Sequence, residues 1–172
     1  MPQHPDSAVF VEYVDSTYRK IFPAMEETGW KFFEQGGLVP DTAKNFTAQV
    51  FVLLVTFAAI DGNITDSEAA FITDVYSAIS PDTDWTTRPL SELKGFYEQT
   101  AKTNIDIGLD VPMALILLQH YDDAKGTDHA TSLKDLFYRL ALGIVRADGQ
   151  VSPLEQSKVD SYKETLFGYT RN

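Results

Sequence analysis

Apolar residues recur at helical spacing along almost the whole chain, with polar residues between them. No segment shows the strict apolar–polar alternation, rich in β-branched side chains, that is typical of a half-buried strand. The pattern therefore predicts an all-α fold, a compact domain of seven to eight helices. The expected helices cover about 7–20, 23–35, 42–60, 65–79, 90–102, 110–121, 132–147 and 153–167.

The first two of these helices are expected to form a hairpin over residues 1–40, packed on a main domain over 41–172. Pro23 favours a helix start, because proline fits the first turn, and a Gly-Gly pair at 36–37 favours a stop. The apolar stretch "VFVLLVTFAAI" at 50–60 is shorter than the roughly 20 residues that span a bilayer. It predicts a buried central helix and no transmembrane segment.

The clearest pattern in the chain is a duplication at an offset of 87 residues. "IDGNITDSE" at 60–68 returns as "ADGQVSPLE" at 147–155, and apolar positions around the two loops align at the same offset. Because a helix–loop–helix unit cannot bury its own apolar face, we expect repeats of about 42–79 and 132–167 to pack with pseudo-two-fold symmetry. The aligned pairs include Phe46 and Leu133, Val50 and Phe137, Leu53 and Leu140, Ile72 and Val159, and Val75 and Tyr162.

Both loops contain the residues of a helix start. Each has a glycine that can adopt a positive φ, followed by a Ser or Thr with a Glu three residues later, the spacing of a capping box. This interpretation assigns a purely structural role to the loops. The residues are Gly62, Thr65 and Glu68 in the first loop and Gly149, Ser152 and Glu155 in the second.

The same loops carry carboxylates in the order found in the second half of an EF-hand calcium loop. The first half is missing, because its leading ligand positions fall on Phe57 and Ile144, so calcium sensing of the EF-hand type is disfavoured. A weaker divalent-cation site completed by water remains an alternative, with the ion undetermined among Ca, Mg, Mn and Zn. Its candidate ligands are Asp61, Asp66, Glu68, Asp148 and Glu155.

The stretches "FAAIDGNITDSEAAFI" and "IVRADGQVSPLEQSKV" resemble the TerB-like family of tellurite-resistance proteins and TerB-like co-chaperone N-terminal domains. The resemblance covers about 42–167. It implies a helical domain with internal pseudo-symmetry, a role in chemical-stress assemblies, metal binding by acidic residues and no catalytic activity established for the family. The second loop departs from the first where Pro153 takes the place of Asp66, which removes one potential ligand.

The net charge and its distribution along the chain limit the kinds of partner that the protein is expected to bind. The formal net charge is −11, and residues 61–130 hold 13 acidic and 4 basic residues, about −9 of the total. Such a field repels phosphate backbones and anionic lipid, which argues against nucleic-acid binding and favours a protein partner with a basic surface. Solubility alone is the competing explanation. The chain has no cysteine, which excludes disulfides and thiolate chemistry and fits a cytoplasmic location.

The remaining candidates for chemistry are weak. His4 is expected in a mobile terminus, and "HYDDAKGTDH" at 120–129 is expected to be a solvated loop, because helical spacing of metal ligands is absent. No nucleophile elbow, phosphate loop or dinucleotide motif occurs, so we expect no enzyme activity. The sequence favours a non-enzymatic module of a stress-response assembly. The alternative is a regulatory domain of a larger machine in which the loops only cap helices; a hydrolase is the least favoured.

Overall fold

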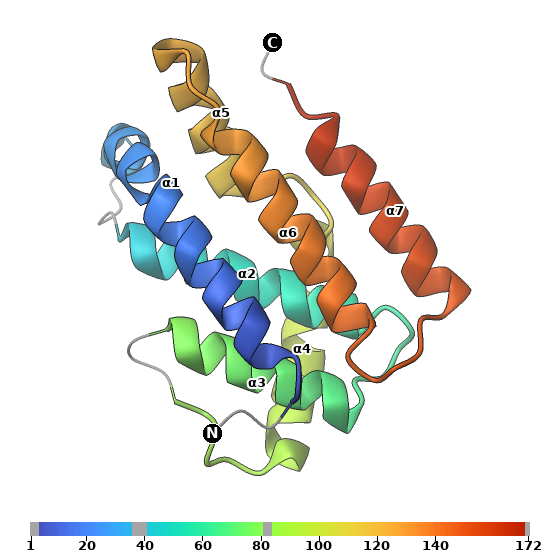
Figure 1. Cartoon of the computed structure of the whole chain (residues 1–172). Coiled ribbons are helices and arrows are strands. Elements are labelled where there is room, and N and C mark those ends of the chain that lie inside the picture. The colour runs from blue at the N-terminus through green and yellow to red at the C-terminus, as the bar shows by residue number, and fades with distance from the viewer. Residues whose placement is uncertain (1–3, 36–40, 81–83, 171–172) are drawn as a thin grey trace.

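The computed structural model describes residues 4–35, 41–80 and 84–170, with only the backbone described over 29–35. All regular secondary structure in these residues is helical, which confirms the all-α prediction (Figure 1). None of the described helices combines the length and the hydropathy needed to cross a bilayer. The helices are α1 (Ser7–Gln35), α2 (Thr42–Ala58), α3 (Asp66–Ile79), α4 (Leu90–Gly108), α5 (Met113–Lys125), α6 (His129–Val145) and α7 (Pro153–Phe167).

Helix α1 corrects the expected break at Pro23. Residues 7–35 form one helix with the proline inside it, in place of a two-helix hairpin. An interior proline removes one backbone hydrogen bond and usually bends a helix, and Figure 1 shows the ribbon of α1 changing direction in its second half. Ile21, Ala24 and Met25 on either side of the proline are buried. Packing against the core therefore carries the helix through a residue that ends helices in isolation.

The segment expected to be a solvated loop over 120–129 is largely helical, and only residues 126–128 separate α5 from α6. The buried Asp122 carboxylate explains this, because it accepts the N–H groups of His129 at 2.9 Å and Ala130 at 2.7 Å. Burial opposes ionisation of this carboxyl, but these two N–H groups together with hydrogen bonds from the side chains of Thr127 and His129 outweigh it and hold the pKa of Asp122 below its usual value.

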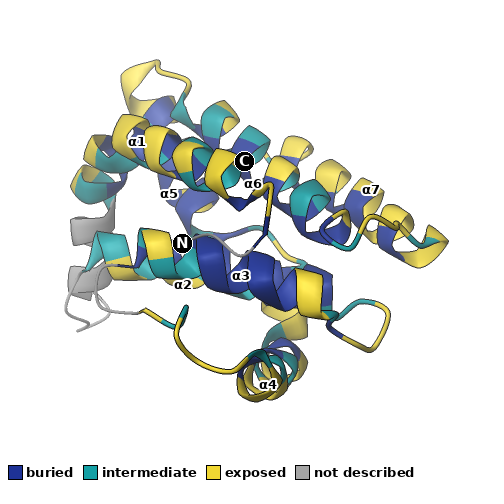
Figure 2. Ribbon diagram, turned by 60° about the horizontal axis from the view of Figure 1, so that its bottom comes forward, coloured by how far each residue is buried: buried dark blue, intermediate teal, exposed yellow. Residues whose placement is uncertain are grey.

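Helix α2 is the central helix, as its apolar stretch predicted. It packs against α3, α4 and α6, and Phe46, Leu54 and Phe57 on it are almost completely buried (Figure 2). Helix α1 lies across α3, α5 and α6. The two helices aligned by the duplication, α2 and α6, thus contact each other directly. The pseudo-symmetry of the two units and the division of the chain near residue 40 remain predictions.

Candidate functional site

The two DG loops, residues 59–65 between α2 and α3 and residues 146–152 between α6 and α7, lie at the same end of the molecule. Figures 1 and 2 show them side by side in both views. The sequence left open whether they meet, because an offset along the chain carries no information about distance in space.

Both predicted capping boxes are formed. The hydroxyl of Thr65 accepts the N–H of Glu68 at 3.1 Å, and the Glu68 carboxylate accepts the N–H of Thr65 at 2.8 Å. In the second loop Ser152 and Glu155 exchange the same two hydrogen bonds at 3.1 and 2.9 Å. These bonds satisfy N–H groups that the first turn of a helix leaves without intrahelical partners.

The turns before the boxes are also as predicted. Gly62 and Gly149 have φ angles of +96° and +81°, in the region that glycine adopts without steric cost. Asp61 and Asp148 each accept the backbone N–H two residues further on, at 3.2 and 2.9 Å. Every polar side chain that the two loops share therefore has a structural role in starting α3 or α7.

The caps give a direct stability prediction. We expect Thr65→Ala and Ser152→Ala each to lower the free energy of unfolding by about 1 kcal/mol, because each leaves one helix-start N–H without its acceptor. Thr65→Ser and Ser152→Thr keep a hydroxyl and serve as controls. Urea denaturation measures all four variants, and equal losses in the hydroxyl-retaining pair would contradict the capping role.

Glu68 of the first capping box is buried close to negatively charged groups. Glu68 is only 1 % exposed. Burial raises the pKa of Glu68, and the hydrogen bond from the Thr65 N–H partly offsets it. The negative charges of Asp148 and Asp61 raise the pKa further, to about 8. A carboxylate of the second loop thus acts on the buried glutamate of the first. The two loops share one electrostatic environment, which neither loop reveals alone.

The five candidate metal ligands are differently placed. Glu68 and Glu155 are buried in their caps, and the exposed Asp66 pairs with Lys94 on α4, with Oδ1 3.0 Å from Nζ. Asp61, Glu68 and Asp148 lie close enough to influence one another electrostatically. Across the described ranges, no group of three or more Asp, Glu or His side chains is arranged to hold an ion. Divalent-cation binding stays a prediction, which titration calorimetry with the four candidate metals would test.

His4 is anchored, in contrast to the mobile terminus expected for it. It is 7 % exposed, and its Nε2 donates to the carbonyl of Ala147, beside the second DG loop, at 2.7 Å. Its backbone N–H donates to Asp74 on α3 at 2.8 Å, and its ring meets the edge of Phe71. His4 therefore links the segment before α1 to α3 and to the second DG loop. No local pattern in the sequence signals this role.

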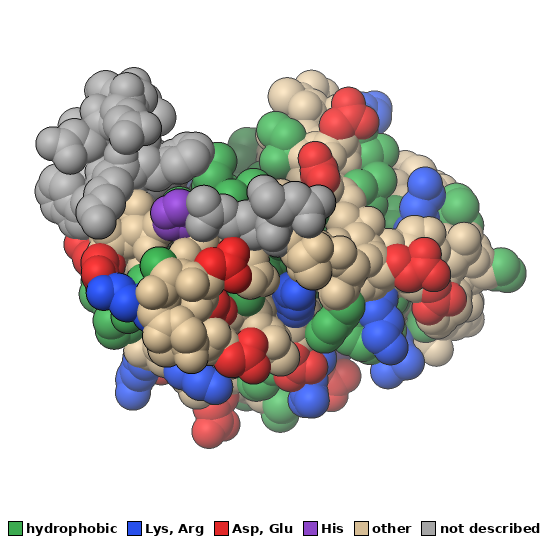
Figure 3. All heavy atoms as spheres, turned by 90° about the horizontal axis from the view of Figure 1, so that it is seen from above, with side chains coloured by type: hydrophobic (Ala, Val, Ile, Leu, Met, Phe, Trp, Pro, Cys, Tyr) green, Lys and Arg blue, Asp and Glu red, His purple; other side chains and the backbone are tan. Residues whose placement is uncertain are grey.

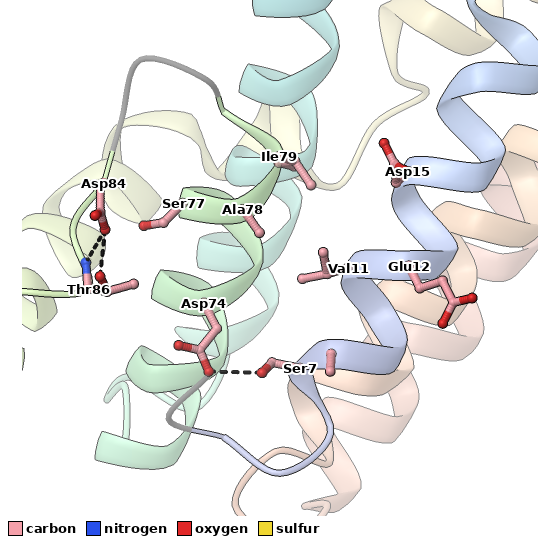
Figure 4. A pocket seen from close by; sticks show the side chains of 11 residues that line it. Ser7, Val11, Glu12, Asp15, Asp74, Ser77, Ala78, Ile79, Asp84 and Thr86 are labelled. Carbon is pink, nitrogen blue, oxygen red and sulfur yellow. Dashed lines mark hydrogen bonds between the residues drawn. The ribbon is translucent and has the colours of Figure 1, made fainter. Parts of the chain in front are cut away.

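An open groove of about 620 Å³ runs between α1 and α3 and reaches the segment before α4 (Figure 4). Four carboxylates line it, those of Glu12 and Asp15 on α1, Asp74 on α3 and Asp84. Among the described residues that line it, none is Lys or Arg. The face drawn in Figure 3 instead carries acidic and basic side chains side by side. The groove is thus a region where charge of one sign collects.

The floor of the groove is apolar. The floor consists of Val11 of α1 and of Ala78 and Ile79 of α3, whose side chains lie between the two helices in Figure 4. Ser7 donates to Asp74 at 2.9 Å and closes one end. Sequence reasoning missed the groove, because its two walls come from helices about 60 residues apart, and only the concentration of acid in 61–130 pointed toward it.

No protein-family model matches the chain, and no match was found among curated proteins or solved structures. The resemblance to the TerB-like family and the stress-response setting that it implies therefore remain predictions from the duplicated motif.

Proposed function

We propose that this protein is a non-enzymatic interaction module whose groove between α1 and α3 receives a basic segment of a partner protein. The observation that carries the proposal is the pairing of an apolar floor with a carboxylate rim in one concave surface. An amphipathic segment with Lys or Arg flanking apolar side chains would satisfy both features at once. The DG loops enter this proposal as structural elements that start α3 and α7.

The rim carboxylates are suited to attracting cations. Glu12 and Asp84 are exposed, and hydrogen bonds from the hydroxyl and N–H of Thr86 hold the pKa of Asp84 below its usual value. Asp15 pairs with Arg19 on its own helix at 2.8 Å, an exposed pair that a partner's cation can displace at little cost. Asp84 therefore remains ionised throughout the neutral range.

The floor supplies apolar contact that charge alone would lack. Val11 and Ile79 are partly exposed in the groove, so a bound side chain would cover apolar surface that water now touches. Apolar contact at the centre with charge at the rim is the usual anatomy of a specific protein interface. The rim would set the association rate and the salt dependence, and the floor would set the lifetime.

A defined peptide tests the proposal. We expect an amphipathic peptide with lysines beside its apolar face to bind saturably, and the same peptide with glutamates in their place not to bind. Binding should weaken as salt rises, because exposed charges are screened. Glu12→Gln combined with Asp84→Asn should raise the dissociation constant about five- to twentyfold at low salt, since two rim charges are lost. Fluorescence anisotropy measures each case.

The matched control makes the same charge change elsewhere. Asp160→Asn combined with Glu164→Gln removes two exposed carboxylates from α7, outside the groove. This variant should bind the lysine peptide as the unmodified protein does. Equal weakening in the two double variants would show attraction to net charge alone and would contradict a role for the groove.

A further inference from the structure

A second pocket lies on a different part of the molecule, between α2, the end of α4, the connection to α5, and α7. Its volume is about 290 Å³. Val52 of α2, with Ile107 and Val111, forms much of its apolar wall, and the side chain of Ile107 is 67 % exposed at the edge. A pocket of this size suits a small molecule and is too small for a folded partner.

The Tyr162 hydroxyl gives this pocket a polar point. Tyr162 is 2 % exposed and lines the pocket from α7, with its ring 5.1 Å from that of Phe57. No group in the described part of the chain hydrogen-bonds its hydroxyl, and the oxygen is not one of the fully enclosed polar atoms, so solvent or a bound molecule can reach it. The hydroxyl of Tyr97, in contrast, shares a hydrogen bond with the hydroxyl of Thr73 at 2.7 Å.

Three other polar side chains line the pocket, those of Asn45, Gln49 and Asp110. Gln49 is already engaged, because it accepts the N–H of Ala114 at 2.8 Å and donates to the carbonyl of Asn45 at 3.1 Å. Asp110 is exposed and places a negative charge in the same lining. Burial and then this charge raise the pKa of Tyr162, so the hydroxyl stays protonated at neutral pH.

We propose that this pocket binds a small amphiphilic amine, whose apolar body lies against Val52, Ile107 and Val111 and whose ammonium group reaches Tyr162 and Asp110. An ammonium group donates hydrogen bonds, so it satisfies the free lone pairs of the hydroxyl and pairs with the carboxylate. A neutral alcohol satisfies only the hydroxyl. A carboxylate head group is repelled by Asp110. The site is independent of the groove between α1 and α3, which shares none of these residues.

Three probes that share one alkyl chain separate these cases: hexylamine, 1-hexanol and hexanoate. Titration of the full chain, followed by amide chemical shifts in NMR spectra, should show saturable binding in the order amine, alcohol, carboxylate. The largest shifts should fall in residues 107–113 and around Val52. Absence of saturable binding for all three probes, or tightest binding of hexanoate, would overturn the proposal.

Two substitutions assign the contacts. Tyr162→Phe removes only the hydroxyl and should weaken hexylamine binding about three- to tenfold, the effect of one lost hydrogen bond. Tyr138→Phe makes the same change outside the pocket and should leave binding unaltered. Asp110→Asn should remove the preference for the amine over the alcohol, while Asp106→Asn, four residues earlier on α4, should keep it. Unchanged binding in Tyr162→Phe, or equal effects of the two aspartate variants, would overturn the assignment.

Discussion

The free energy of unfolding should fall as pH rises from about 4.5 to about 8, and Glu68→Gln should remove most of that fall. The pKa of the buried Glu68 carboxyl is raised from an ordinary value near 4.5 to about 8. Between these values the folded state holds a proton that the unfolded chain has released. The stabilising contribution is therefore complete below pH 4.5 and lost as pH rises through 8, with a slope of up to about 1.4 kcal/mol per pH unit.

The glutamine variant isolates this effect, because an amide at the same position of a capping box still accepts the Thr65 N–H. Urea denaturation at pH 5, 7 and 9 should show that the free energy of unfolding of the variant increases relative to that of the unmodified protein as pH rises. Other groups titrate in this range, so the difference between the two proteins is the informative quantity. Glu155→Gln provides the same substitution in the second capping box as a reference.

The neighbouring loop should tune the effect. Asp148→Asn removes a negative charge that raises the Glu68 pKa, so the loss of stability should be smaller and should finish at a lower pH. Asparagine can still accept the N–H that Asp148 accepts, which preserves the turn. Parallel pH profiles for Glu68→Gln and the unmodified protein would contradict the raised pKa. An unchanged profile in Asp148→Asn would show that the loops do not interact.

The second large effect concerns Gly108 at the end of α4. Gly108→Ala should lower the free energy of unfolding by about 1–3 kcal/mol, because the new methyl group would overlap Thr56 on α2. A Cβ at this position would lie 2.7 Å from Thr56 Cβ and 2.9 Å from its Cγ2, besides meeting the hydroxyl. Thr56 is buried and β-branched, so it has few alternative rotamers. Helices α2 and α4 would have to separate.

Gly95 on the same helix is the matched control and should respond in the opposite direction. Among the described residues, a Cβ at this position would meet no atom within 4 Å beyond its chain neighbours and the backbone of its own helix. Gly95→Ala should therefore raise the free energy of unfolding by up to about 1 kcal/mol, through the better helix propensity of alanine. Thermal or urea denaturation compares the two variants.

A double variant locates the cause of the Gly108 effect. Thr56→Ala removes the hydroxyl and the Cγ2 that the new methyl group would meet, so it should recover much of the loss in Gly108→Ala. Among the residues that the structure describes, none hydrogen-bonds the buried Thr56 hydroxyl, so its removal leaves no described partner group stranded. Additive losses in the double variant would show that the destabilisation arises elsewhere.

Features that depend on neighbours in the chain could be predicted from sequence. The capping boxes at Thr65 and Ser152 and the positive φ angles of Gly62 and Gly149 are formed as expected. Each is decided by hydrogen bonds or sterics within a few residues. The central position of α2 also followed from composition, because a helix that is apolar almost all round must be covered on every side.

Features that depend on distant residues could not be predicted from sequence. Pro23 predicted a helix break, but burial of its neighbours in the core keeps α1 continuous. His4 donates a hydrogen bond to the carbonyl of Ala147, 143 residues away, and no local sequence motif predicts that contact. The groove likewise required α1 and α3 to meet, so its rim carboxylates Glu12, Asp15 and Asp84 are scattered along the sequence.

The DG loops contain both kinds of feature, those fixed by the local sequence and those fixed by the packing of the whole chain. The amino-acid sequence by itself determined their backbone, their caps and the starts of α3 and α7, because those interactions close within four residues. Only the tertiary structure decided that the loops lie side by side, that Glu68 is buried and that the charge of Asp148 acts on it. Burial and through-space charge depend on how the helices pack, and packing is a property of the whole chain.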